Sequence, residues 1–468
     1  MMTIRYTVLG GVGGRRALLG RVLRVATIPA LFLTTACSVD DILQVTDPDV
    51  ANPEGLVGEA ALPALFAGAL SDFQVGYSGS SNGDGQITIS GLLSDELYNS
   101  ESFPTRIEID QRRMRDDNGT LRGAFLDMQQ ARAAAERAAR RFEEFQSGTI
   151  DHAHMLNVAG LSYITFGENY CSGVPFSTLE DDGTITFGEQ QTTEQMFETA
   201  VAKFDEALGM LDPDDEDAEA QLFLAQVGKG RALLNLGRFA EAAAAVEGVP
   251  DDFVYLIEHS ENSGRQQNPV FTLVNVSRRF SVPDAEGGNG VNFRTAGDPR
   301  VPVILNPTNS IGLDNETPSY IPQKYSSRGS DIPVATGIEA RLVEAEAELQ
   351  AGNYGGAGGT LEILNALRAT MAPEDATLAP LPAVATLEDQ VNQLFYERAF
   401  WLYLTSHRVG DMRRLVRQYS RGTETVFPTG DYHKSGSLPY GTDVNLPLPD
   451  DEANNPNVGE SLCLDRNA

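Results

Sequence analysis

The three cysteines of this 468-residue chain have the surroundings that say most about chemistry. Cys37 follows a segment with five arginines and no acidic residue (1–24), a short apolar run (25–33) and three small residues. This order is typical of a secretory signal, and the run is too short for a bilayer, which takes about 20 residues. A cysteine directly after the small residues indicates a lipoprotein signal over residues 1–36. We expect lipid on the Cys37 thiol and an acylated N-terminus after cleavage.

An ordinary signal with an incidental cysteine is the alternative. Arg15 and Arg16 faintly resemble a twin-arginine signal, which leaves the export route (Sec or Tat) open. In an oxidising exported compartment, the two other cysteines, Cys171 and Cys463, most simply form a disulfide, although two free thiols are also compatible with the sequence. The bridge would tie the polar C-terminal tail to the middle of the fold. It requires the two Cα atoms to lie about 4.4 to 6.8 Å apart.

The search for catalytic and metal-binding motifs finds little. "GYSGS" at 76–80 lacks the last glycine of a serine-hydrolase elbow, and His152 and His154 would point to different sides of a helix. Around Asp84, "SNGDGQI" has part of a calcium loop, but Ser80 and Gly91 occupy positions that need carboxylates. A plain turn is therefore favoured over calcium. We predict a protein that is not an enzyme and has no catalytic residues, no cofactor and no metal.

The strongly acidic charge of the chain argues against some classes of binding partner. The full chain carries 35 basic and 66 acidic residues, and loss of the five signal arginines brings the mature chain to about −36. Such a chain will not seek nucleic acid or an anionic membrane surface, so the lipid must hold it at the membrane. With 41% hydrophobic residues it can bury a large core. We expect one domain over 37–468.

Helical patterns supply most of the elements that must position any site. Apolar and alanine residues recur at helical spacing over 120–145 and 151–170, the second beginning at Asp151 as a possible cap. The segment 192–212 opens with Thr192 and Gln195, which fit a capping box.

Two later segments have the small-residue and aromatic spacing of tetratricopeptide hairpins. The segment 218–250 predicts two helices broken at Gly237, and 339–369 repeats the pattern. The "GGAGG" at 355–359 follows a helix, so a nucleotide-binding loop is disfavoured. The fold class is therefore mainly α, a tetratricopeptide-like scaffold with long irregular loops and minor β structure.

Segments 259–337 and 420–468 have a different composition, rich in Gly, Pro, Asn and Ser. One run, "PVFTLVNVS" (269–277), predicts a strand. We interpret both segments as ordered binding loops on the helical scaffold, because they carry aromatic residues of the kind that face ligands: Phe280, Phe293, Tyr320, Tyr325, Tyr432 and Tyr440.

Five segments together resemble the SusD/RagB family of outer-membrane nutrient-binding lipoproteins, over nearly the whole mature chain. They are "LLSDELYNS" (92–100), "LSYITFGENYCSGVPFST" (161–178), "RLVEAEAEL" (341–349), "YERAFWLYLTSHRVGDMRRL" (396–415) and "LPLPDDEANNPNV" (446–458). The last two carry the resemblance most strongly. Ser406 stands where the family usually has glycine, and Met412 replaces a leucine.

The resemblance implies a non-enzymatic receptor, lipid-anchored in the outer membrane and facing the cell exterior. It would deliver an oligosaccharide or peptide to a SusC-type TonB-dependent transporter. The ligand loops would fall near residues 98–103 and in 259–337, which gives the candidates Tyr98, Phe103, Phe280, Phe293 and Tyr320. Neither loop contains tryptophan, which argues against a starch-like helical ligand. The alternatives are a tetratricopeptide scaffold lipoprotein and a surface glycoside hydrolase.

Charged residues in the 396–415 segment predict a buried structural ion network rather than catalysis. Glu397 and Arg408 are eleven residues apart and could not pair within one continuous helix, whereas Arg408 and Asp411 could. Trp401 sits among apolar residues and is expected in the core.

Overall fold

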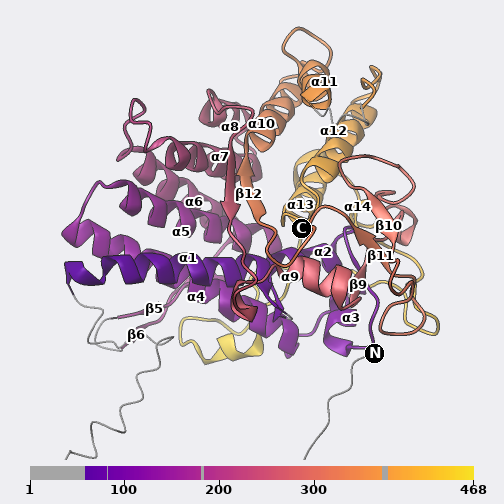
Figure 1. Cartoon of the computed structure of the whole chain (residues 1–468), viewed down its shortest axis with the longest axis horizontal. Helices are drawn as coiled ribbons and strands as arrows, with labels where there is room; N and C mark the ends of the chain where they lie inside the picture. The colour runs from indigo at the N-terminus through magenta and orange to yellow at the C-terminus, as the bar shows by residue number, and fades with distance from the viewer. Residues whose placement is uncertain (1–57, 82, 181–183, 371–377) are drawn as a thin grey trace, which may run out of the picture. The chain divides into compact units, whose positions relative to one another are not determined.

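Helices packed one on the next form the scaffold of the computed structural model, which describes residues 58–81, 83–180, 184–370 and 378–468. Each helix contacts its successor in the order α1–α4–α5–α6–α7–α8–α10–α11 (Figure 1). The bounds are α1 Leu62–Ser78, α4 Gly119–Phe145, α5 Ile150–Asn169, α6 Thr193–Leu208, α7 Glu219–Asn235, α8 Phe239–Val246, α10 Gly337–Gln350 and α11 Thr360–Thr370. The predicted mainly α class is confirmed. Cys37 and the predicted signal lie outside the described residues.

Small residues allow the stacked helices to approach closely. The buried ring of Phe204 on α6 lies against Gly160 of α5 and Gly228 of α7. A Cβ at either glycine would come within 2.7 Å and 2.4 Å of that ring, respectively. Because real Cβ contacts are longer, glycine at both positions is what lets one phenylalanine hold three helices together.

Helix boundaries follow the sequence closely, with one correction. Thr192 and Gln195 form the predicted capping box of α6. The cap of α5 is Thr149, whose hydroxyl accepts from the His152 amide, and not Asp151, which lies inside the first turn. A carboxylate there still interacts favourably with the positive end of the helix. Gly237 adopts φ +73° and breaks α7 from α8, as predicted.

The 396–415 segment is not one helix. Helix α12 (Leu387–Trp401) ends before α13 (Arg408–Tyr419) begins, and Leu404 and Ser406 between them adopt left-handed φ values of 53° and 61°. We call residues 402–407 the α12–α13 connection. A left-handed residue is unfavourable for any side chain, so tertiary contacts must hold it.

The predicted strand at 269–277 is wrong. Pro269–Phe271 forms the short helix α9, and Thr272–Val276 continues as a π-helical turn, η5. Asn268 caps this segment by accepting from the Phe271 amide. Valine and phenylalanine suggested a strand by propensity, but a cap and burial of Val270, Leu273 and Val274 decide for a helix.

Short strands and turns occupy the rest of the chain. The antiparallel pairs are β1 Gly79–Ser80 with β2 Gly83–Asp84, β3 Tyr98–Asn99 with β9 Phe280–Ser281, β4 Val174–Pro175 with β7 Gln190–Gln191, β5 Thr178–Leu179 with β6 Ile185–Thr186, β8 Val254–Ile257 with β12 Ile332–Thr336, and β10 Val303–Leu305 with β11 Tyr320–Pro322. The remaining helices are α2 Gln86–Leu93, α3 Pro104–Asp110 and α14 Thr423–Val426, with the 3₁₀ turns η3 Glu59–Ala61, η4 Gly264–Gln266, η6 Glu286–Gly288 and η7 Asp450–Asn454. Among the described residues, none of the helices has the length and apolar character needed to span a membrane.

Candidate functional site

Cys171 and Cys463 are joined by a disulfide that fixes the C-terminal tail. Their Cα atoms lie 5.8 Å apart, inside the range expected from the sequence. Backbone hydrogen bonds flank the bridge, because Ser172 donates to the Asp465 carbonyl and Leu464 donates to the Ser172 carbonyl. The tail is therefore held at the C-terminal end of α5 by both covalent and hydrogen bonds.

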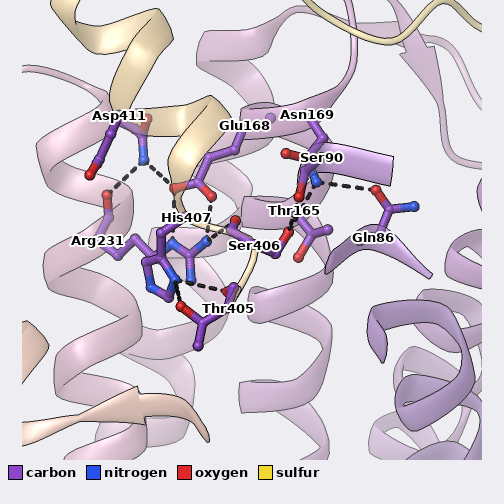
Figure 2. Close-up of polar contacts among 12 residues, drawn as sticks. Gln86, Ser90, Thr165, Glu168, Asn169, Arg231, Thr405, Ser406, His407 and Asp411 are labelled. Atoms are coloured by element: carbon purple, nitrogen blue, oxygen red, sulfur yellow. Dashed lines mark hydrogen bonds and ion pairs between the residues drawn. The ribbon is translucent and has the colours of Figure 1, made fainter. Parts of the chain in front are cut away.

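A buried polar network surrounds the α12–α13 connection (Figure 2). Glu168 of α5 accepts two hydrogen bonds from Arg231 of α7, one of 2.9 Å from Nε, and a third of 2.8 Å from Asn235. Arg231 also donates to the backbone carbonyl of Ser406 at 3.1 Å. One carboxylate thereby links α5 to α7, and one arginine links α7 to the connection.

The hydroxyl of Ser406 lies in the same network. It accepts from Asn169 Nδ2 at 3.3 Å and lies 3.4 Å from the Ser90 hydroxyl. Asn169 donates in addition to Gln86 at 3.1 Å (Figure 2). The left-handed Ser406 is thus held by side chains from α2 and α5, and glycine would fit the same backbone without strain.

Arginine pairs continue the network along α12 and α13. Arg398 makes two hydrogen bonds of 2.8 Å to Asp411, and Arg414 donates to the same carboxylate at 2.7 Å. Arg414 also contacts Glu346 of α10. Burial alone would raise the pKa of Asp411, but Arg398 and Arg414 overcome it and hold that pKa below its usual range.

The three charged residues singled out in the sequence are all buried, but they have other partners than expected. Glu397 pairs with Arg300 and Arg368, each at 2.6 Å. Arg408 pairs with Asp95 at 2.6 and 2.8 Å rather than with Asp411. Arg408 begins a new helix, so its side chain turns toward the 92–100 segment while Asp411 faces Arg398.

This network links α5 to α7, α12 to α13 and α10 to α13 through buried charged contacts. Its carboxylates are each satisfied by arginine, and they are nearly inaccessible to solvent, from 0% exposed for Glu397 and Glu346 to 4% for Glu168. We call the residues just described, around α12, α13 and their connection, the buried ion network. Trp401 lies at the end of α12, half-buried, with the Arg300 guanidinium 4.9 Å from its ring.

Three of the five predicted ligand-binding aromatics are buried. Tyr98 and Phe280 lie on the paired strands β3 and β9, and Phe293 packs against Phe400 and Tyr403. Their exposures are 7%, 0% and 1%. Tyr325, Tyr432 and Tyr440 are buried as well. The interpretation of the six loop aromatics as exposed was therefore wrong for five of them, and Tyr320 is the exception. Long loops need apolar side chains of their own to pack on the scaffold.

Phe103 and Tyr320 are the two candidates that reach the surface. Phe103 is 52% exposed, and the Arg106 guanidinium lies 5.6 Å from its ring and 5.4 Å from that of Phe280. Tyr320 is half-buried on β11, with the Arg294 guanidinium 4.1 Å from its ring centre. The Tyr320 amide donates to the hydroxyl of Ser281, the residue opposite Tyr98, so β11 lies beside the β3–β9 pair. We call residues 98–110, 280–294, 320–322 and 428–443 the loop region (Figure 1).

A pocket of about 340 Å³ lies where the loop region meets α12 and α13. Its lining includes Tyr396, Asn289, Asn392 and Arg421. Tyr396 is 37% exposed, and its hydroxyl donates to Asn292 at 3.0 Å. Sequence reasoning placed Tyr396 in a structural motif and missed that it faces outward, because periodicity does not tell which loops cover a helix.

Three side chains from distant segments meet in the loop region. Asp110 ends α3, Glu286 begins η6 and His433 lies in the 428–443 segment; one oxygen or nitrogen from each lies within 4.8 Å of the others. Asp110 and Glu286 are buried, whereas His433 is exposed. Burial raises the pKa of Asp110, and burial together with the charge of Asp110 raises that of Glu286. Sequence reasoning missed this cluster because its members lie far apart along the chain.

Asp84 does not resemble a calcium ligand in this fold. Its carboxylate accepts from Arg106 at 2.6 and 2.8 Å, and Asp84 lies on β2, opposite Gly79 of β1. An arginine supplies the positive charge, which agrees with the plain turn favoured by the sequence.

Comparison with solved structures shows a shared fold at low sequence identity. A SusD superfamily protein from Bacteroides fragilis matches with a TM-score of 0.62 and 13% identity, over 85% of this chain and 98% of that one. A laminarin-binding SusD-like protein matches with a TM-score of 0.61 and 15% identity, over 86% and 99%. A SusD-like carbohydrate-binding protein from Bacteroides fragilis NCTC 9343 matches with 0.61 and 14%, over 86% and 99%. No protein-family model and no curated protein matches the sequence.

Proposed function

Because the chain has the SusD-like fold, we propose that it is a cell-surface lipoprotein that captures a glycan and delivers it to a SusC-type TonB-dependent transporter. The observation that carries the proposal is the likeness over nearly the whole length of structures described as carbohydrate-binding and laminarin-binding. The glycan, the transporter and the lipid anchor are the parts that experiment must test.

The surface of the loop region has chemistry that suits a sugar. Aromatic rings held on ordered backbone stack against pyranose faces at low entropic cost. Phe103 and Tyr320 are such rings, and the half-buried Arg294 beside Tyr320 has N–H groups that can donate hydrogen bonds. A long glycan could contact both rings, since shallow aromatic surfaces suit polymers that a closed pocket would exclude.

Binding to laminarin and to a panel of other soluble glycans, measured by affinity electrophoresis and calorimetry, tests the proposal. Phe103→Ala and Tyr320→Ala should each weaken binding of the recognised glycan about tenfold, the loss of roughly one stacking contact. Phe187→Ala is the matched control, because Phe187 is 43% exposed but lies between β6 and β7, outside the loop region. Equal affinity in all variants would contradict a site on these two rings.

The pocket beside Tyr396 is the second position at which a glycan could bind. It is concave and combines an exposed ring with the amide groups of Asn289 and Asn392, the mixture expected of a small-molecule site. If Tyr396→Ala weakens binding while Phe103→Ala does not, the glycan end is held in this pocket.

Binding without turnover separates this function from the glycoside hydrolase alternative. A hydrolase needs two accessible carboxylates at a fixed separation in a cleft. In the part of the chain that the structure describes, Asp110 and Glu286 bring carboxylate oxygens within 4.8 Å, but these residues are 1% and 7% exposed. Prolonged incubation should therefore return the glycan intact by mass spectrometry, and released oligosaccharide would overturn the proposal.

The anchor and the transporter have separate tests. Cys37→Ala should release the protein from membranes, and its retention there with the signal cleaved would contradict lipidation. The wild-type protein should co-purify in mild detergent with a large outer-membrane barrel. Repeated purification alone, from cells that express the neighbouring transporter, would favour the scaffold alternative.

A further inference from the structure

Asp110, Glu286 and His433 have the geometry of a three-residue metal site. One ligand atom from each lies within 4.8 Å of the other two, close enough for a single ion between them. The residues come from α3, η6 and the 428–443 segment, so nothing local in the sequence brings them together.

Each of the three side chains is also held by a hydrogen bond. Asp110 Oδ2 accepts from the Tyr432 hydroxyl at 2.5 Å and the Asn99 amide at 2.6 Å, and Glu286 Oε1 accepts from the Tyr440 hydroxyl at 2.6 Å. His433 Nε2 lies 2.9 Å from the Asn99 carbonyl oxygen, which can only accept. Nε2 therefore carries the proton, and Nδ1 keeps a lone pair. Such outer contacts are what orients metal ligands in proteins.

Each carboxylate also has a second oxygen to which no N–H group, and no hydroxyl outside the pair, donates among the described residues. Asp110 Oδ1 and Glu286 Oε2 are both buried, and the two carboxyl groups lie close enough to hydrogen-bond through a shared proton. Asp110 and Glu286 are themselves 1% and 7% exposed. Buried carboxylate oxygens are normally satisfied by a donor or a cation. The protein supplies arginine for this purpose throughout the buried ion network, but not here.

We propose that Asp110 Oδ1, Glu286 Oε2 and His433 Nδ1 bind one divalent transition-metal cation of the zinc class. Two oxygens and an imidazole nitrogen suit zinc, whereas calcium and magnesium prefer oxygen ligands alone. The exposed His433 gives the ion a route from solvent, and water would complete the coordination. The bound ion pins the 428–443 segment to α3 and η6 and so fixes the loop region. The site stands independently of the glycan proposed above.

Zinc titration of the purified, chelator-treated protein tests the site. Calorimetry should give one Zn²⁺ per chain, and Co²⁺ in its place should give visible absorption bands of a nitrogen- and oxygen-ligated ion. Zn²⁺ should also raise the melting temperature, because an ion that binds only the folded chain stabilises it. His433→Ala removes an exposed ligand, so it should fold normally and lose stoichiometric binding.

Two further variants keep the test decisive. Tyr432→Phe removes only the hydrogen bond to Asp110 and should weaken Zn²⁺ binding about 10- to 100-fold. Asp431→Asn is the matched control, since Asp431 is an exposed carboxylate two residues from His433 and outside the cluster; its affinity should equal that of the wild type. No saturable Zn²⁺ binding, or binding that His433→Ala leaves unchanged, would overturn the proposal and leave a carboxyl pair that shares a proton.

Discussion

The buried ion network and the loop region satisfy their buried carboxylates in opposite ways. In the network, Asp411 and Glu346 each form an ion pair with an arginine, and Asp95 forms one with Arg408. In the loop region, Asp110 and Glu286 lie close to each other, and each accepts a hydrogen bond from a tyrosine hydroxyl. A carboxylate paired with arginine is stable as a charge, whereas a pair of carboxylates needs a proton or a cation. The first arrangement suits a permanent support and the second a site that binds something.

The segments that resemble the SusD/RagB family supply residues of the buried ion network. The segments 92–100, 161–178 and 341–349 supply three residues that contact α13, namely Asp95, Glu168 and Glu346. Asp95 pairs with Arg408, the Glu168 backbone carbonyl accepts from Arg413, and Glu346 pairs with Arg414. Leu446 from the last segment donates to the Asn169 carbonyl. The motifs that carry the resemblance are thus contacts that fix the fold. They carry no information on the ligand surface that we propose in the loop region.

Removal of Asp411 should have the largest effect on stability. Asp411→Ala leaves Arg398 and Arg414 buried without their shared carboxylate. Breaking a buried pair in this way costs about 3–5 kcal/mol, so urea denaturation should show a loss of that size or an unfolded protein. The surface pair Glu388–Arg421 is the control, because the Glu388 side chain is 70% exposed. Glu388→Ala should change the free energy of unfolding by about 0–1 kcal/mol. Similar losses of unfolding free energy in both variants would show that the buried ion pairs stabilise the fold no more than a surface pair does.

Loss of the disulfide should come next. Cys463→Ser opens a loop with a sequence separation of 292 residues. A bridge of this kind contributes about 2–4 kcal/mol, but the backbone pairs of Ser172 with Leu464 and Asp465 should keep the tail docked. Reduction of the wild-type protein should lower the free energy of unfolding equally. Unchanged stability in both experiments would mean that hydrogen bonds alone hold the tail.

The scaffold could be predicted from sequence because its signals are local. Capping at Thr192, the break at Gly237 and the helical periods of 120–145 and 218–250 depend on residues a few positions apart. The disulfide pairing followed from elimination, since two cysteines were left. That argument needed no knowledge of the fold.

Site residues could not be predicted because their burial depends on distant contacts. Phe280 and Phe103 are both phenylalanines near turns, yet Phe280, on the strand that pairs with β3, is fully buried and Phe103 is 52% exposed. The break at Ser406 was equally hidden, since a serine inside a helical pattern gives no sign of a left-handed residue. The partners of Arg408 and His433 lie in segments more than 300 residues away.

The pH dependence of stability separates two adjacent buried acids, Asp95 and Glu96. Burial raises the pKa of Glu96 to about 8, since it has no arginine of its own, whereas Arg408 holds the pKa of Asp95 below its usual range despite burial. In the unfolded chain Glu96 loses its proton near pH 4.5 but in the folded chain near 8. Stability should therefore fall as pH rises between these values, by about 1.4 kcal/mol per unit.

Glu96→Gln isolates this contribution. Glutamine mimics the protonated acid and can still accept from the Leu404 amide, which lies 2.8 Å from Glu96 Oε1. The decline in unfolding free energy between pH 5.5 and 7.5 should flatten in this variant. Lys324, whose pKa burial lowers to about 8, contributes only above this window. A slope that survives the substitution would assign it to other buried acids.

Ser406 offers the smallest and most specific test of the network, because two opposed effects meet at one residue. Ser406→Ala keeps the left-handed φ of 61° and loses the contacts with Asn169 and Ser90, which should cost about 0.5–1.5 kcal/mol. Ser406→Gly loses the same contacts but relieves a strain of roughly 1–2 kcal/mol. The glycine variant should therefore be more stable than the alanine variant and close to the wild type in urea denaturation. If alanine is the better substitution, strain at Ser406 is negligible. If both variants are as stable as the wild type, the Ser406 hydroxyl is not what holds the α12–α13 connection.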